Sequence, residues 1–113
     1  MTVTIVMWNL RESDQTIESL RDYLRGYAVD AYSSLDGMHL KAWFGNSKHD
    51  TWGAVYVWDS TANISDLFTV SRAVELIGYQ PSWVGHFTLE ATAMGNSAHK
   101  SLSGLGAAFD AQP

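Results

Sequence analysis

The amino-acid sequence predicts an α+β domain with the element order β-α-β-β-α-β, and three observations lead to this class. Four segments alternate apolar and polar residues as strands do. Two segments between them repeat apolar residues at the spacing of an amphipathic helix. Turn-forming dipeptides and polar loops separate the segments. This order is typical of a ferredoxin-like fold, in which two helices cover one face of a four-stranded antiparallel sheet.

The first half of the pattern is a strand followed by a helix. Residues 3–9 alternate and predict the first strand. Ser13 or Asp14 can cap the helix that follows, because both side chains accept hydrogen bonds from free backbone N–H groups. Gly26 should weaken this helix and bend or break it locally. The apolar stripe of the helix consists of Ile17, Leu20, Leu24, Tyr27 and Ala31.

The second half is a hairpin, a helix and a last strand. Residues 38–44 and 51–58 read as strands, and the polar loop 45–50 between them has hairpin length. Apolar residues at helical spacing predict a helix over 67–77. Alternation returns at 83–92 and predicts the fourth strand.

The length of the chain predicts one folded domain with a tail. A chain of 113 residues hides roughly two thirds of its unfolded surface, which suffices for one core but not for two. We expect the domain to span residues 1–94 and the Gly/Ser/Ala-rich stretch 95–113 to form a C-terminal tail. Three apolar residues should dock this tail on the protomer or its partner, namely Leu102, Leu105 and Phe109.

Composition excludes several classes of function. A net charge of −5 argues against nucleic acid as a partner, because its phosphates need basic groups. The absence of cysteine excludes disulfides, zinc–thiolate sites and thiol nucleophiles. No apolar run has the length of a membrane span and no basic segment opens the chain, so we expect a cytoplasmic protein without a membrane partner. Five Trp and five Tyr are many for this length, and such rings gather in cores, interfaces and small-molecule pockets.

The hairpin residues predict how the sheet is covered. Alternation places Val55 and Val57 on one face of the third strand, and their small size suits close packing against helices. The helix-free face would then carry four large rings, those of Trp43, Trp52, Tyr56 and Trp58. Because an exposed patch of this kind favours aggregation, two sheets should pair face to face and form a homodimer.

Two stretches of the hairpin carry a family pattern, Gly37-Met38-His39-Leu40-Lys41-Ala42-Trp43 and Gly53-Ala54-Val55-Tyr56-Val57-Trp58. With their Lys-x-Trp and Tyr-x-aromatic motifs they resemble the YdhR-like family of proposed monooxygenases. The resemblance extends more weakly over residues 3–92 and leaves out the tail. It implies a dimeric α+β barrel, in which two ferredoxin-like protomers join their sheets. It also implies oxygenation of an aromatic or polyketide-like molecule of secondary metabolism without an organic cofactor, although the wider group includes heme proteins and isomerases.

The family pattern marks Lys41, Trp43 and Tyr56 as candidate site residues. The indole and the phenol can hold a planar substrate, and the phenol can hydrogen-bond a carbonyl or phenolate oxygen. A dimer interface would use the same residue types for packing. Lys41 can stabilise an enolate or a superoxide-like anion. Alternatively, its stem covers apolar surface at the rim of the sheet while its ammonium reaches water.

Further candidates lie on neighbouring strands. His39 and His86 can act as general bases near neutral pH, although a strand histidine is more often a hydrogen-bonded surface residue. Asn9 ends the first strand, where its amide can polarise a carbonyl group or simply form a turn. Trp8 and Trp58 complete the set as candidate substrate-binding rings.

The leading hypothesis is a small cofactor-free enzyme for an apolar, aromatic or polyketide-like molecule, a monooxygenase by resemblance. The alternatives are a cyclase, isomerase or dehydratase with the same pocket, and a non-catalytic small-molecule-binding dimer. No histidine pair has metal-ligand spacing, so no metal is expected, while a single histidine could still hold a heme. The pocket can lie between sheet and helices or between two sheets.

Overall fold

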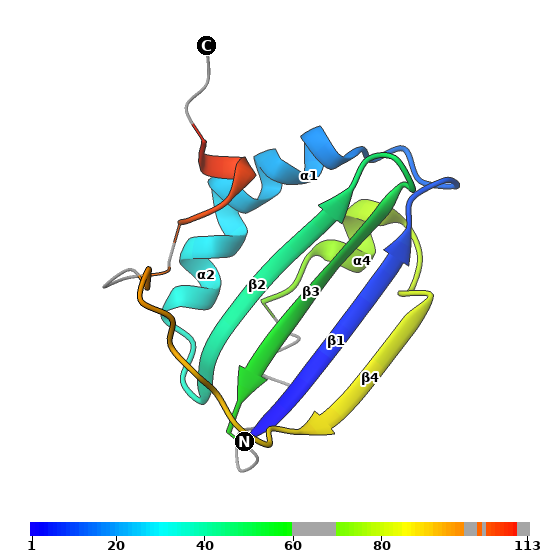
Figure 1. The fold of residues 1–113 in the computed structure, drawn as a ribbon. Helices are drawn as coiled ribbons and strands as arrows, with labels where there is room; N and C mark the ends of the chain where they lie inside the picture. Colours follow the sequence, from blue (N-terminus) through cyan, green and yellow to red (C-terminus); the bar gives the residue numbers. More distant parts are fainter. Residues whose placement is uncertain (60–69, 99–101, 103, 111–113) are drawn as a thin grey trace.

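Four antiparallel strands form a single sheet in the computed structural model, which describes residues 1–59, 70–98, 102 and 104–110 (Figure 1). The strands are β1 (Thr2–Asn9), β2 (Met38–Asn46), β3 (Thr51–Trp58) and β4 (Trp83–Thr88). Their spatial order is β2-β3-β1-β4, so β1 and β3 are central and β2 and β4 form the edges. The sheet and the helices beside it confirm the predicted α+β class, with a fourth strand shorter than expected.

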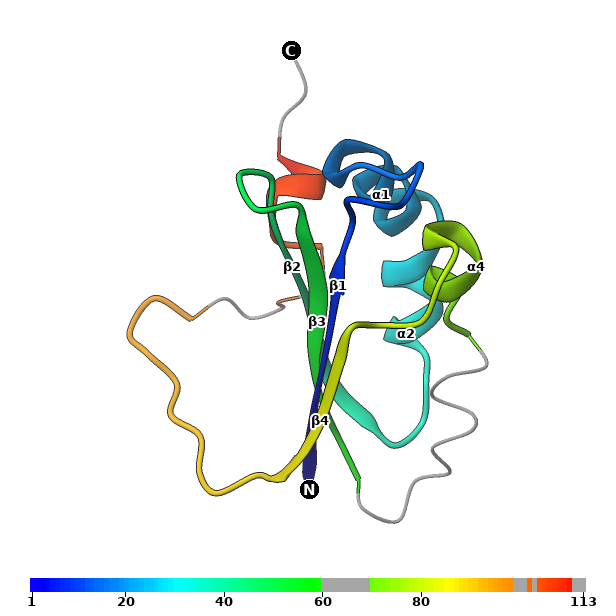
Figure 2. The same cartoon turned by 90° about the vertical axis from the view of Figure 1, so that its right-hand side faces the viewer.

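The helices lie on one face of this sheet, which Figure 2 shows edge-on. They are α1 (Ile17–Tyr23), the π-helix η1 (Leu24–Ala28), α2 (Val29–Ser33) and α4 (Ala73–Ile77). Of the helix predicted over 67–77, the first residues lie outside the described part of the chain, and 73–77 are helical. Among the described residues, no helix is both long and apolar enough to cross a membrane.

Thr16 caps the start of helix α1, and not Ser13 or Asp14 as predicted from the sequence. The Thr16 hydroxyl accepts a hydrogen bond from the Ser19 backbone N–H, and the Ser19 hydroxyl accepts one from the Thr16 N–H. Ser13 instead donates its hydroxyl to the Ile77 carbonyl at 2.7 Å. The segment before α1 is therefore tied to the end of α4.

A π turn shifts the phase of the helix that starts with α1. In η1 the backbone N–H of Val29 donates to the carbonyl of Leu24, five residues back, so this turn holds one residue more than an α turn. Gly26, which was expected to disturb the helix, lies in the middle of the turn. Beyond it the buried residues are Ala28 and Tyr32, each one position later than the predicted stripe. The extra residue thereby turns the Tyr32 side chain towards the sheet.

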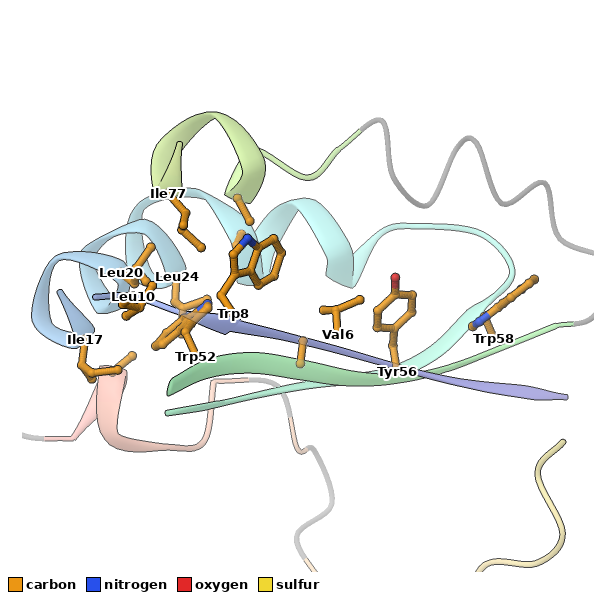
Figure 3. Close-up of a cluster of buried hydrophobic side chains, with 14 residues drawn as sticks. Val6, Trp8, Leu10, Ile17, Leu20, Leu24, Trp52, Tyr56, Trp58 and Ile77 are labelled. Atoms are coloured by element: carbon orange, nitrogen blue, oxygen red, sulfur yellow. The ribbon is translucent and has the colours of Figure 1, made fainter. Parts of the chain in front are cut away.

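The large rings of the sheet face the helices, so the predicted assignment of the two faces was wrong. Figure 3 shows Tyr56 and Trp58 projecting from β3 into the layer between the sheet and the helices. Neither they nor Trp52 are more than 7 % exposed. The helices contribute both large and small residues to this layer, and the large side chains of the sheet share it with Ala28 and Ala73.

The opposite, helix-free face of the sheet carries the aliphatic residues of the strands and a few exposed rings. Phe44, Trp83 and Phe87 are 39, 45 and 49 % exposed. A Cβ atom on Gly53 would collide with the Phe44 ring, and one on Gly85 with the rings of Trp83 and Phe87. These rings therefore lie over backbone that lacks a side chain, and the helix-free face is apolar and shallow.

The C-terminal tail returns to the domain through the short 3₁₀-helix η2 (Ala107–Phe109). Ala108 is buried in the core, and its carbonyl accepts a 2.6 Å hydrogen bond from Nη1 of Arg25. The predicted anchors Leu102, Leu105 and Phe109 are each at least 40 % exposed in the protomer, and their docking on a partner stays a prediction. Residues 89–98 swing out on the helix-free side of the sheet before the tail returns (Figure 2).

Candidate functional site

A β-bulge in β2 decides which side chains of this strand face the helices. The pairing between β2 and β3 shifts by one residue between Met38 and Leu40, which leaves His39 outside the ladder. After the shift, Lys41 pairs with Tyr56 on the helix-facing side of the sheet. The bulge therefore keeps Lys41 in the covered layer and removes His39 from it.

The ammonium nitrogen of Lys41 lies among three aromatic rings that come from three different elements. It is 3.6 Å from the ring centroid of Tyr32 in α2, and 4.9 Å from the centroids of both Trp43 in β2 and Tyr56 in β3. Tyr32 and Trp43 also contact each other edge to face, with centroids 5.7 Å apart. Because ring faces attract a cation, these contacts hold the end of the Lys41 side chain between sheet and helices.

The protonation of this cluster follows from its burial. Among the described residues, no carboxylate lies within ion-pair distance of the Lys41 nitrogen. Desolvation lowers the pKa of Lys41 from 10.5 to about 7. Burial raises the pKa of Tyr32 to about 12 and raises the pKa of Tyr56 as well. Near neutral pH the site therefore holds a lysine that gains and loses a proton and two phenols that keep theirs.

A cavity of about 480 Å³ lies beside these rings, between the sheet and the helices. Its aromatic wall consists of Trp8, Tyr23, Tyr32, Trp43, Trp52 and Tyr56. Val74 of α4 and Pro81 bound it on the helix side, and Lys41 and Glu75 are the charged residues among its described lining. We call this space the aromatic cavity. Its volume and its apolar wall suit a flat small molecule.

A second hollow of about 630 Å³ lies along the β2 edge of the sheet, bounded by β2, α1, α2 and the tail. Lys41, Tyr32 and Trp43 line this hollow as well, so Lys41 stands between the two spaces. Tyr56 lines only the aromatic cavity, whereas His39 lines only the second hollow. The aromatic cavity is therefore the space in which Lys41 and Tyr56 can act on one molecule.

Thr4 connects Trp58 of the central sheet with His86 on β4. The fully buried Thr4 hydroxyl accepts a 2.8 Å hydrogen bond from Nε1 of Trp58 and lies 2.9 Å from Nδ1 of His86. Since an indole N–H only donates, the hydroxyl is the acceptor of the bond with Trp58, while the direction of its bond with Nδ1 depends on the tautomer of His86. These two hydrogen bonds orient the side chains of Trp58 and His86. Neither side chain lines the aromatic cavity.

Replacing Thr4 by Val should destabilise the protein by about 1–3 kcal/mol, because the indole N–H of Trp58 would remain buried without an acceptor. The measurement is the urea midpoint of wild type and variant. Thr88→Val, at an exposed position on β4, is the matched control and should stay within about 0.5 kcal/mol of wild type. Equal midpoints for the two variants would contradict a structural role of the Thr4 hydroxyl.

The structure brings together half of the residues predicted to form the site. The aromatic cavity is lined by four of them, Trp8, Lys41, Trp43 and Tyr56. His39 lies at the surface, with Nε2 2.6 Å from Oδ1 of Asp59. Asn9 is exposed, and its Oδ1 accepts a 3.0 Å hydrogen bond from the Arg11 N–H, which is the turn-forming alternative of the sequence analysis.

The sequence analysis missed Tyr23 and Tyr32, which complete the cavity wall from the helices. Tyr32 makes the closest ring contact with Lys41, and the Tyr23 hydroxyl accepts a 3.3 Å hydrogen bond from the Arg72 N–H. A regular α-helix places Ala31 in the stripe and Tyr32 beside it. The signal that could have found Tyr32 is Gly26, because a helix irregularity at that point changes the phase of every residue beyond it.

Comparisons with protein-family models and with curated proteins find no match for this chain. The assignment of a chemistry therefore rests on the residues of the site. Within the described residues, no group of three or more His, Asp or Glu side chains is placed to hold a metal ion. The reactive groups at the aromatic cavity are the Lys41 amine and the neighbouring phenols.

Proposed function

We propose that the protein is an enzyme that binds a flat, apolar molecule in the aromatic cavity and removes a proton from it with Lys41. The observation that carries this proposal is the position of the Lys41 nitrogen, held among three rings at the wall of an apolar cavity. With its pKa near 7, a large share of Lys41 is a free amine at neutral pH and can accept a proton.

The neighbouring groups supply the rest of this chemistry. The rings on both sides of the amine can hold a flat substrate so that its acidic C–H bond faces Nζ of Lys41. The phenol of Tyr56 keeps its proton and can donate a hydrogen bond to the oxygen on which negative charge develops. The protonated lysine that results is itself stabilised by the ring of Tyr32.

The fate of the resulting carbanion separates a monooxygenase from an isomerase or cyclase. Under the resemblance to YdhR-like proteins the carbanion reacts with dioxygen, and without dioxygen it takes up a proton at another carbon. Dioxygen uptake during turnover of a carbon acid, followed with an oxygen electrode, distinguishes the two reactions. Binding without any turnover would favour the non-catalytic small-molecule-binding protein.

The experiment that tests the proposed base uses 5-nitrobenzisoxazole, a flat aromatic compound. Loss of its single acidic C–H proton opens the ring to a coloured phenolate, so the reaction needs nothing but a base in an apolar site. We expect the protein to accelerate ring opening, with a rate that rises with pH and levels off above about 7. A rate no faster than that of free lysine at the same pH would contradict the proposal.

We also propose that two protomers pair through the helix-free face and form a homodimer. Leu40, Phe44, Trp83 and Phe87 are exposed there, and Val55 lies in the middle of the face on a central strand. An apolar face of this kind gains roughly 25 cal/mol for each Å² removed from water. A second copy presents the same surface, so the two faces can pair about a two-fold axis.

Light scattering at micromolar concentration should give the mass of a dimer for wild type and of a monomer for Val55→Lys. The variant places a charge at the centre of the paired faces, where it would lose its water shell. Ser47→Lys in the exposed β2–β3 turn adds the same charge and should remain dimeric. A monomeric wild type would refute the dimer.

A further inference from the structure

The Lys41 nitrogen is open to the aromatic cavity and makes neither a hydrogen bond nor an ion pair with the described residues. Its contacts are the faces of Tyr32, Trp43 and Tyr56, and all three rings line the same cavity. A surface lysine donates its protons to water or to a carboxylate, whereas this one is held by ring faces alone. Among the described residues, ring faces are thus its neighbours, and a free amine at this point can meet a molecule that enters the aromatic cavity.

We infer that Lys41 is also a nucleophile that forms an iminium with an aldehyde or ketone bound in the aromatic cavity. The inference rests on the proposed function in that both assign the reactive amine to Lys41. It adds a covalent step and names the substrate class, which is a flat, apolar carbonyl compound. Lysines activated in this way lie in apolar pockets that favour the free amine.

The step balances without any further reactant. The Nζ lone pair adds to the carbonyl carbon and gives a carbinolamine, whose hydroxyl leaves as water while the nitrogen–carbon double bond forms. Neutral amine and carbonyl thus yield one iminium and one water with the uptake of one proton. The iminium carries its positive charge where the ammonium was, 3.6 Å from the Tyr32 centroid, so the rings that hold the ammonium also stabilise the product.

The chain contains its own controls for this reaction. Its other lysines are Lys48 and Lys100, and Lys48 lies exposed in the β2–β3 turn. An exposed lysine at pH 7 is almost entirely ammonium, because its pKa is about 10.4. An aldehyde bound in the aromatic cavity should therefore react with Lys41 faster than with Lys48 of the same molecule.

The experiment treats the full chain with 2-naphthaldehyde and sodium cyanoborohydride at pH 7, which reduces the iminium to a stable amine. Intact mass should rise by the mass of one aldehyde less its oxygen atom. Peptide mass spectrometry should place at least tenfold more label on Lys41 than on Lys48, with a rate that saturates as the aldehyde concentration increases. Lys41→Arg, which keeps the charge but cannot form an iminium, should lose the fast label.

A second variant tests whether the cavity delivers the aldehyde. Val74→Trp narrows the cavity from α4 and leaves Lys41 in the sequence, and it should slow the labelling of Lys41 at least fivefold while Lys48 reacts as before. Equal labelling of Lys41 and Lys48 in wild type would overturn the inference. Lys41-dependent ring opening of 5-nitrobenzisoxazole without a Lys41 adduct would also overturn it and leave the proposed base intact. An adduct without ring opening would support the nucleophile and contradict the base.

Discussion

Replacing Lys41 by Met is expected to reduce the opening of 5-nitrobenzisoxazole by about 10²-fold or more, which is the usual effect of removing a general base. The methionine side chain has nearly the length of lysine and preserves the apolar packing against Tyr32, but it accepts no proton. The wild-type rate should reach half of its plateau near pH 7. With a lysine in water as the base, the rate would reach half of its plateau only above pH 10.

Two further variants test whether ring opening needs the free amine of Lys41 or only its positive charge. Lys41→Arg retains the cation and its ring contacts but stays protonated, so it should be as slow as Lys41→Met. Lys48→Met removes an exposed lysine from the β2–β3 turn and should keep the wild-type rate. Full activity in Lys41→Arg would show that charge alone accelerates the reaction, and it would contradict the proposal that Lys41 is the base. The titratable groups that share the cavity wall with the amine are Tyr23, Tyr32 and Tyr56, whose raised pKa values keep them neutral through this range, and Glu75 of α4.

The same Lys41→Met variant should be more stable than wild type at neutral pH, by on the order of 2 kcal/mol. Burial opposes the charged form of Lys41 in the folded state, whereas the unfolded chain keeps its lysine protonated up to about pH 10.5. Between about pH 7 and 10.5 the unfolded state therefore binds more protons, and the stability of wild type rises with pH. Below pH 7 both states are protonated, and the destabilisation is at its largest.

Urea unfolding at several values between pH 6 and 10 measures this effect. The difference in unfolding free energy between Lys41→Met and wild type should be greatest at pH 6 and shrink towards pH 10. The exposed Lys48 should give no such trend when it is replaced by Met. A difference that stays constant over the whole range would mean that Lys41 is solvated in the folded protein.

The element order could be predicted from the sequence because it depends on local periodicity. The strands 38–44 and 51–58 and the helix break at Gly26 were recognisable as patterns of neighbouring residues. The face that the helices cover could not be predicted in this way, because alternation defines two faces without saying which one the helices cover. The covered face depends on how the rings pack with helical residues such as Leu20 and Ala28, which is a property of distant segments of the chain.

The candidate site was predictable in its strand residues and not in its helical ones. Lys41 and Tyr56 lie on paired strands, where alternation in each strand already places them on one face. His39 was predicted as a site residue but does not line the aromatic cavity, because the bulge moves it out of the ladder. A one-residue bulge carries no clear signal in a single sequence. Tyr32 was missed for the corresponding reason in a helix, since one additional residue in η1 alters its direction.

The π turn decides which side chain of the helix lies beside Lys41. Each residue advances an α-helix by about 100°, so the same sequence wound without the π turn would present Ala31 and not Tyr32 to the sheet. The amine would then lose its nearest ring and face a void of roughly the size of a phenol. The one residue that η1 holds beyond an α turn is thus what places an aromatic ring, and not a methyl group, beside the Lys41 amine.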